Sequence, residues 1–262
     1  MTVLGEELRF ADPGEAADLA AFLARLIHYD RAAAVRLQAG GGVLAVFGRP
    51  PSFEVLAIRT ARLAADTVLD TTVSAGQFAD ALDTGARRMA GGAGAAPDGL
   101  DVAVPEAVTG PPWAGLLPPR GGWRQVPGLP GAAEVRGAVA SAVAEFRARD
   151  AALPEERRTR AERDRIGREI WSRTLGETGL PLRAVHAAQS LGFLRPGRAP
   201  APVAAAVATG PSGGGTTALA PEPEQLALLA AGGWLRLRTP YGSIAVRKTG
   251  LPGLSGLSVT PA

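Results

Sequence analysis

The sequence predicts an α+β protein in two parts: a small antiparallel sheet with helices, followed by a helical domain that a C-terminal β-hairpin completes. Three observations support this prediction. Helix-start signals and glycine-bounded apolar strands alternate in the N-terminal part of the chain. Three helical segments follow between residues 133 and 192, and an alternating apolar pattern runs from Trp234 to Lys248.

The first predicted domain spans residues 1–104 and opens with a strand and a helix. The strand is the short apolar stretch 8–10. The helix begins at Asp12 with Pro13 in its first position, and both residue types are favoured at helix starts. Apolar residues then recur at helical spacing, which predicts an amphipathic helix: Leu19, Phe22, Leu23, Leu26 and Ile27.

Strands are expected after this helix. Three apolar stretches are predicted strands: 34–38, 43–47 and 53–59. Gly40, Gly41 and Gly42 join the first two as a hairpin, because glycine adopts positive φ without steric cost. Residues 68–73 fit either a fourth strand or the approach to the next helix.

The next helix has a defined start and a less defined end. Ser74 and Gln77 form a capping box, and the helix is expected to end before Gly85. The small residues of 91–99 show no periodicity, which is typical of a linker. The first domain is therefore predicted as a small antiparallel sheet with helices on one side.

The second predicted domain spans residues 105–250. A proline-rich, irregular connector at 105–130 contains two tryptophans, which favours an ordered segment over a free linker. Helical segments are then expected at three places: 133–150, 155–173 and 181–191. In the segment 155–173, glutamate and arginine alternate at helical spacing, which predicts a solvated helix held by pairs of opposite charge.

The C-terminal part of the second domain combines loops with a hairpin. Residues 195–223 are rich in Pro, Ala and Gly and predict a flexible insertion. In the hairpin 234–248, Leu235 and Leu237 alternate with polar residues, which predicts one apolar face and one solvated face. The tail 251–262 is expected to be disordered.

The composition excludes several kinds of chemistry. The chain has no cysteine, which rules out disulfides, cysteine-ligated metals and thiol nucleophiles. His28 and His186 are the only histidines, and they do not supply the converging ligands of a metal site. The glycine-rich stretch 210–217 lacks the lysine of a phosphate-binding loop. We therefore expect a non-enzymatic protein without a cofactor or a metal.

Charge and hydropathy bear on location and partners. No stretch is long and apolar enough to span a bilayer, and residues 1–10 lack the basic and apolar regions of a signal peptide. We expect a cytoplasmic protein with no membrane partner. The net charge is only +3, and Lys248 is the single lysine, so charge alone does not favour nucleic acid as the partner.

The order of elements in the C-terminal half leaves one nucleic-acid alternative open. Three helices followed by a two-stranded hairpin is the element order of a winged helix, in which the hairpin is the wing. Five cations would then contact nucleic acid: Arg183, Arg236, Arg238, Arg247 and Lys248. This alternative requires that the four arginines share one face.

Several short strings in the chain resemble an uncharacterised actinobacterial family, typical of Streptomyces and its relatives. They are FEVLA at 53–57, PPRGGW at 118–123, GLPLR at 179–183, LGFL at 191–194, WLRL at 234–237 and YGS at 241–243. Members of that family are described as paired domains of unknown function. The resemblance implies no activity or cofactor, but it implies that 118–123 is folded and that the chain divides near residue 105.

The favoured function is contact with another protein, including a second copy of this chain. Large aromatic side chains are enriched in such interfaces, so the four tryptophans are the candidate contact residues: Trp113, Trp123, Trp171 and Trp234. Burial of all four would remove the support for this expectation. A second alternative is an enzyme with a pocket between the domains, formed by groups such as His28, Asp30, His186 and Tyr241.

Overall fold

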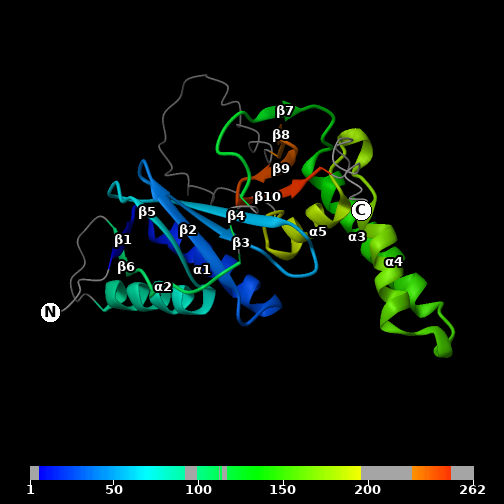
Figure 1. Cartoon of the computed structure of the whole chain (residues 1–262), viewed down its shortest axis with the longest axis horizontal. Coiled ribbons are helices and arrows are strands. Elements are labelled where there is room, and N and C mark those ends of the chain that lie inside the picture. Colours follow the sequence, from blue (N-terminus) through cyan, green and yellow to red (C-terminus); the bar gives the residue numbers. More distant parts are fainter. Residues whose placement is uncertain (1–5, 92–98, 112, 114–116, 196–225, 249–262) are drawn as a thin grey trace, which may run out of the picture.

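The computed structural model describes residues 6–91, 99–111, 113, 117–195 and 226–248 (Figure 1). Most of its strands form one antiparallel sheet. These strands are β2 (Ala34–Gly40), β3 (Val43–Gly48), β4 (Leu56–Arg62), β5 (Leu69–Ser74), β7 (Arg124–Val126), β8 (Ala227–Ala231), β9 (Trp234–Thr239) and β10 (Gly242–Arg247). Their order across the sheet is β5-β2-β3-β4-β10-β9-β8-β7. The expected α+β class is confirmed.

The C-terminal hairpin joins the N-terminal sheet directly. Strand β10 pairs with β4 in antiparallel register, and Ile244 lies opposite Ala57. The sheet therefore consists of two halves with matching order, each a three-stranded meander with one additional strand at its outer edge. The sequence predicted both the N-terminal strands and the hairpin, but it did not predict that they share hydrogen bonds.

Helices α1 (Pro13–Tyr29), α2 (Ala75–Ala90) and α5 (Leu182–Ser190) cover one face of this sheet, which we call the inner face. Helices α3 (Ala132–Ala151) and α4 (Arg160–Ser172) pack on α5 and on each other. The predicted starts of α1 and α2 are confirmed, since Asp12 accepts a hydrogen bond from the Gly14 amide and Ser74 accepts one from Gln77. None of the described helices is long and apolar enough to cross a membrane.

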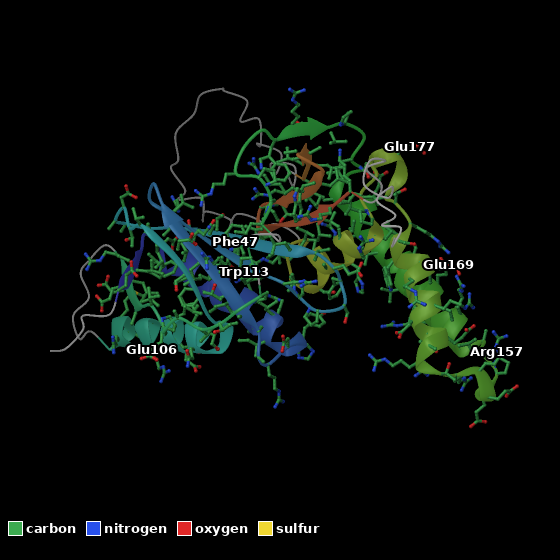
Figure 2. All side chains as sticks on the ribbon, viewed as in Figure 1. Phe47, Glu106, Trp113, Arg157, Glu169 and Glu177 are labelled. Atoms are coloured by element: carbon green, nitrogen blue, oxygen red, sulfur yellow. The ribbon has the colours of Figure 1, made fainter. Side chains whose placement is uncertain are left out.

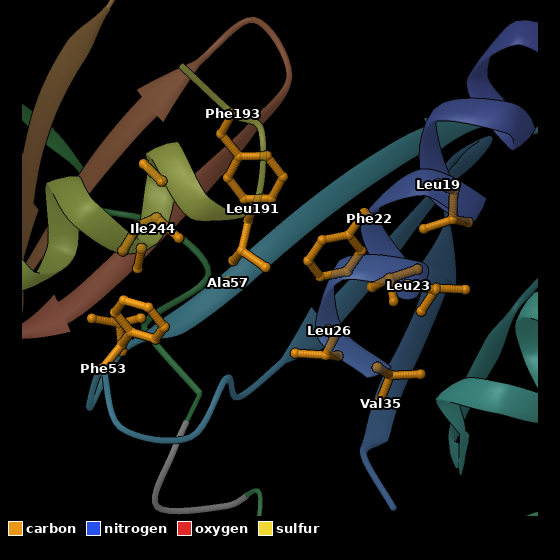
Figure 3. Packing of buried hydrophobic residues seen from close by; sticks show 14 of the residues in the cluster. Leu19, Phe22, Leu23, Leu26, Val35, Phe53, Ala57, Leu191, Phe193 and Ile244 are labelled. Carbon is orange, nitrogen blue, oxygen red and sulfur yellow. The ribbon is translucent and has the colours of Figure 1, made fainter. Parts of the chain in front are cut away.

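The core under the inner face is continuous across the two halves. Buried residues of α1 and α5 belong to the same apolar cluster as the inward-facing residues of β2, β4 and β10. Phe22 of α1 stacks on Phe193, which follows α5, with 5.6 Å between the ring centroids. Figure 3 shows Phe193 and Leu191 close to Ala57 and Ile244, where the two halves of the sheet meet. This packing ties the halves together beyond the hydrogen bonds of β4 and β10.

The opposite face of the sheet, which we call the outer face, has a second apolar cluster. Its buried members are Leu56, Ile58, Trp113, Trp234 and Ala245. Phe47 packs against this cluster, and Figure 2 shows it beside Trp113. Trp113 and Trp123 belong to the predicted connector, so these two residues of the connector pack on the sheet.

Helices α3 and α4 project away from the sheet as a helical hairpin (Figures 1 and 2). Arginines and carboxylates of the two helices pair across it. Three of these pairs are Arg149–Glu169 and Arg163–Asp150 at 2.7 Å and Arg173–Glu145 at 2.6 Å, and Arg165 and Glu162 pair at 2.7 Å within α4. The predicted solvated helix with paired charges is confirmed, although α4 begins at Arg160 and not at 155.

Two predicted boundaries differ from the structure. Helix α2 continues through Gly85 to Ala90, because Gly85 packs on a strand that the sequence did not reveal, β6 (Leu100–Ala103). A Cβ at Gly85 would lie 2.7 Å from the Asp101 carbonyl oxygen, so this glycine serves close packing and not helix termination. Strand β6 pairs with β1 (Glu7–Phe10) in a separate two-stranded sheet.

Strand β4 also differs from its prediction, because it begins at Leu56 and not at Phe53. Ser52 and Glu54 adopt positive φ in the preceding turn, and this turn directs Phe53 into the core. The predicted flexible insertion at 195–223, apart from Arg195, and the predicted tail at 251–262 lie outside the described residues. The glycine-rich stretch 210–217 also lies outside them.

Candidate functional site

The outer face of β9 and β10 gathers four of the residues that the sequence singled out: Trp234, Arg236, Arg238 and Arg247. Alternation along β9 turns Leu235 and Leu237 into the core and places Trp234, Arg236 and Arg238 on the outer face. Arg247 of β10 lies opposite Trp234 and shares this face. We call the three arginines the cationic face: Arg236, Arg238 and Arg247.

Arg236 is the least satisfied member of the cationic face. Its side chain is half-buried, and its Nε atom is buried without a hydrogen-bond partner. The guanidinium lies over the Trp123 ring, 5.8 Å from the centroid. Burial lowers the pKa of Arg236, and the positive charge of Arg238 lowers this pKa further. No described carboxylate pairs with Arg236.

The other cations of this region are more exposed. Arg238 is exposed on the same face, opposite Ser243 of β10 and Ala227 of β8. The Arg247 guanidinium lies over the Trp234 ring at 4.7 Å. Lys248 follows β10, and its amide donates to the Gly233 carbonyl oxygen. Strands β7 to β10 contain no acidic residue at all, so no strand carboxylate neutralises this part of the outer face.

The four tryptophans divide between two places. Trp113 and Trp234 are buried in the outer-face cluster, and Trp123 is half-buried at its margin beside Arg236. Trp171 is half-buried in α4, among the helices of the inner face, where it stacks on His186. Two of the four thus keep partial exposure, and one of these belongs to the cationic face region.

Arg183 does not join the other predicted contact residues. It lies on α5, which packs on the inner face, and its Nε is 3.7 Å from a carboxylate oxygen of Glu54. The hairpin of β9 and β10 is also not a free wing, since both of its strands have further partners, β8 and β4. The arrangement that a winged helix requires of these arginines is therefore not present.

A second charged cluster lies where the two halves of the molecule meet on the inner side. The Arg59 side chain is only 9% exposed, and its Nη2 donates to Asp18 of α1 at 3.0 Å. Its Nη1 donates to the carbonyl oxygen of Tyr241 in the β9–β10 turn. Arg195 donates to the same Asp18 at 2.6 Å and covers the Tyr241 ring at 3.8 Å. One carboxylate thus serves two guanidinium groups.

The sequence did not point to this cluster, although one signal for it was present. Arg59 occupies an inward position in strand β4, between the core residues Ala57 and Ala61, where alternation predicts a core residue. An arginine at such a position requires a buried partner. Only the folded chain brings Asp18 and Tyr241 to it.

Two family models together account for nearly the whole chain. The model of a domain of unknown function, DUF8185, matches residues 118–251, slightly more than half of the chain. The chain belongs to the DUF8185 family. A model of another domain of unknown function, DUF8010, matches residues 4–115. These matches confirm the paired domains that the resemblance implied, whereas no curated protein and no solved structure matches the chain.

The cationic face lies in the DUF8185 segment, and on the inner side the two segments are in contact. An aromatic row crosses this contact. Tyr29 and Phe53 of the DUF8010 segment lie 5.5 Å apart, and Phe53 lies 5.3 Å from His186 of the DUF8185 segment. Trp171 stacks on His186 at 4.3 Å. Burial lowers the pKa of His186, so this side chain is held as neutral imidazole.

The polar groups expected of an inter-domain enzyme site lie in different places. His28 and Ser190 line a hollow of about 380 Å³ beside α1, whereas Asp30 lines another of about 450 Å³ with Arg49 and Thr109. His186 belongs to the aromatic row, and Tyr241 to the cluster around Asp18. Within the described residues, no group of His, Asp and Glu side chains could hold a metal ion.

Proposed function

We propose that this protein is a non-enzymatic binding protein that docks an acidic protein partner on its cationic face. The observation that carries the proposal is the single sign of charge there. Arg236, Arg238 and Arg247 lie together on a part of the sheet whose strands contain no acidic residue. A surface of one sign attracts partners of the opposite sign and orients them during association.

A protein partner fits this surface better than nucleic acid does. Base stacking requires exposed aromatic rings, but Trp113 and Trp234 are 6% and 7% exposed, and the Arg236 guanidinium lies over the half-buried ring of Trp123. Reading of duplex DNA by a winged helix requires a recognition helix beside the wing, whereas Arg183 of α5 lies on the inner side. An acidic segment needs neither feature, since carboxylates pair directly with arginine.

Binding of fluorescein-labelled polyglutamate tests the proposal. We expect binding at low salt that weakens as salt is added. The charge reversal Arg238→Glu should weaken it roughly tenfold, because association loses its electrostatic steering. The matched control is Arg147→Glu, an exposed arginine on the helical hairpin, and it should leave the affinity unchanged. Equal losses in the two variants would assign the binding to net charge alone and overturn the proposal.

Two further measurements distinguish an acidic protein partner from nucleic acid and from a second copy of this chain. Single-stranded oligothymidylate and duplex DNA serve as competitors, and tighter binding of either than of polyglutamate would replace the acidic partner by nucleic acid. Sedimentation of the protein alone tests self-association. A dimer that Arg238→Glu dissociates would make a second copy the partner. Cytoplasmic location and actinobacterial origin stay predictions from the sequence.

A further inference from the structure

Arg236 differs from Arg59, the buried arginine of β4, in what meets its charge. The Arg59 guanidinium donates to the Asp18 carboxylate and to a backbone carbonyl oxygen. Arg236 is half-buried over the ring of Trp123, pairs with no described carboxylate and has the positive charge of Arg238 acting on it. The Nε of each arginine lacks an acceptor, so the difference lies in the carboxylate. Removing a guanidinium from water without supplying an anion is costly. Among the described residues, the position therefore lacks one negative charge.

The neighbours of Arg236 define which kind of ligand could supply this negative charge. Across the strands, Arg236 lies between Leu229 of β8 and Ala245 of β10, and Leu56 of β4 follows in the same row. Together with Trp123, these side chains make an apolar floor around one guanidinium. A singly charged carboxylate neutralises one guanidinium and pairs with it through two parallel hydrogen bonds. A phosphate dianion would bring a second charge onto the same apolar floor.

Resting on the proposed function, we propose that Arg236 is the receptor for one carboxylate of the acidic partner, presented beside an apolar side chain that packs on Leu229 and Trp123. Arg236 then forms the desolvated centre of the interface. Arg238, exposed two residues further along β9, lies at the rim. A buried pair of this kind governs the dissociation rate, whereas a rim charge governs the association rate and its dependence on salt.

Three short peptides of equal length test the apolar part of the proposal. In one, Glu alternates with Leu; in the second, Glu alternates with Ser; in the third, Gln alternates with Leu. We expect the Glu/Leu peptide to bind most tightly, the Glu/Ser peptide more weakly and the Gln/Leu peptide not at all. Equal binding of the Glu/Leu and Glu/Ser peptides would overturn the apolar contact.

Variants of β9 test the role of Arg236. Arg236→Lys keeps the charge but cannot form two parallel hydrogen bonds, so the dissociation rate of the Glu/Leu peptide should rise about 30-fold or more. Arg238→Met should instead slow association and reduce its salt dependence. Arg147→Met is the matched control, and thermal melting verifies that each variant is folded.

The possible results separate this inference from the proposed function. If Arg236→Lys dissociates like the wild type while Arg238→Met still slows association, Arg236 is not the receptor and the cationic face remains the docking surface. If the wild type binds neither Glu-containing peptide nor polyglutamate at low salt, the proposed function fails, and this inference fails with it.

Discussion

The helical hairpin and strand β9 both carry arginines, but among the described residues the hairpin provides carboxylates for them, whereas Arg236 of β9 pairs with none. Arg149 and Arg173 share Glu145 and Glu169 across α3 and α4. On β9, Arg236 has an aromatic ring and another arginine as its neighbours. An arginine-rich surface is therefore not in itself a binding surface. Guanidinium groups that fold without a counter-charge are the more informative signal.

Removing a carboxylate from buried arginines gives the largest expected effect. Asp18→Asn would leave the buried guanidinium of Arg59 without its counter-charge. We expect a loss of about 2–3 kcal/mol in the free energy of unfolding, below the full cost of breaking a buried pair because Asp18 is itself partly exposed. Urea unfolding measures this, with the exposed Asp83→Asn of α2 as the control. Equal losses in both variants would contradict the role of Asp18.

On the outer face, removing a charge is expected to raise the free energy of unfolding and not to lower it. Arg236→Met removes a half-buried charge that pairs with no described carboxylate and keeps an unbranched apolar stem. We expect a gain of about 1 kcal/mol in the free energy of unfolding, together with loss of binding to the Glu/Leu peptide. Urea unfolding and peptide titration of the same sample check both. A destabilised variant would show that Arg236 serves the fold through its stacking on Trp123.

A smaller effect on stability is expected from His186, the histidine of the aromatic row. The pKa of His186 is lowered in the folded protein by burial, so the unfolded chain binds the proton more readily. Stability is then highest above the ordinary pKa of 6.5 and falls as the pH drops through the lower folded-state pKa. His186→Gln should flatten this part of the pH profile of thermal melting, and an unchanged profile would contradict the role of His186.

The smallest effect is expected in the helical hairpin, where exposed charges are paired. Hydrogen bonds from Arg149 lower the pKa of Glu169 to about 2, so its contribution is present above the ordinary value of 4.5 and is lost as the pH falls toward 2. Glu169→Gln should lower the melting temperature only slightly, because solvent and salt screen such pairs. The difference from the wild type should vanish at high salt. A loss as large as that of Asp18→Asn would contradict the comparison.

Local features of the fold were predictable because their causes are local. The caps at Asp12 and Ser74, the glycine turn at 40–42 and the alternation in β9 depend on residues within a few positions of one another. Strand β6 and the full length of α2 were not predictable, because Gly85 packs on a strand that lies distant in sequence. Alternation in the sequence identified Arg236 and Arg238 as outward-facing candidates. It could not predict that no described carboxylate would pair with Arg236.

The sequence alone determined most of the helices and strands, the arginine content of the β9–β10 hairpin and the exclusion of cysteine chemistry. These follow from spacing and composition, which do not depend on how the chain packs. The tertiary structure decided which charges meet. Pairing of β10 with β4 merges the two halves into one sheet and brings Tyr241 to Arg59, which Asp18 of α1 also meets. It leaves Arg236 on the outer face without a described counter-charge. Long-range register sets these contacts, and no local pattern encodes them.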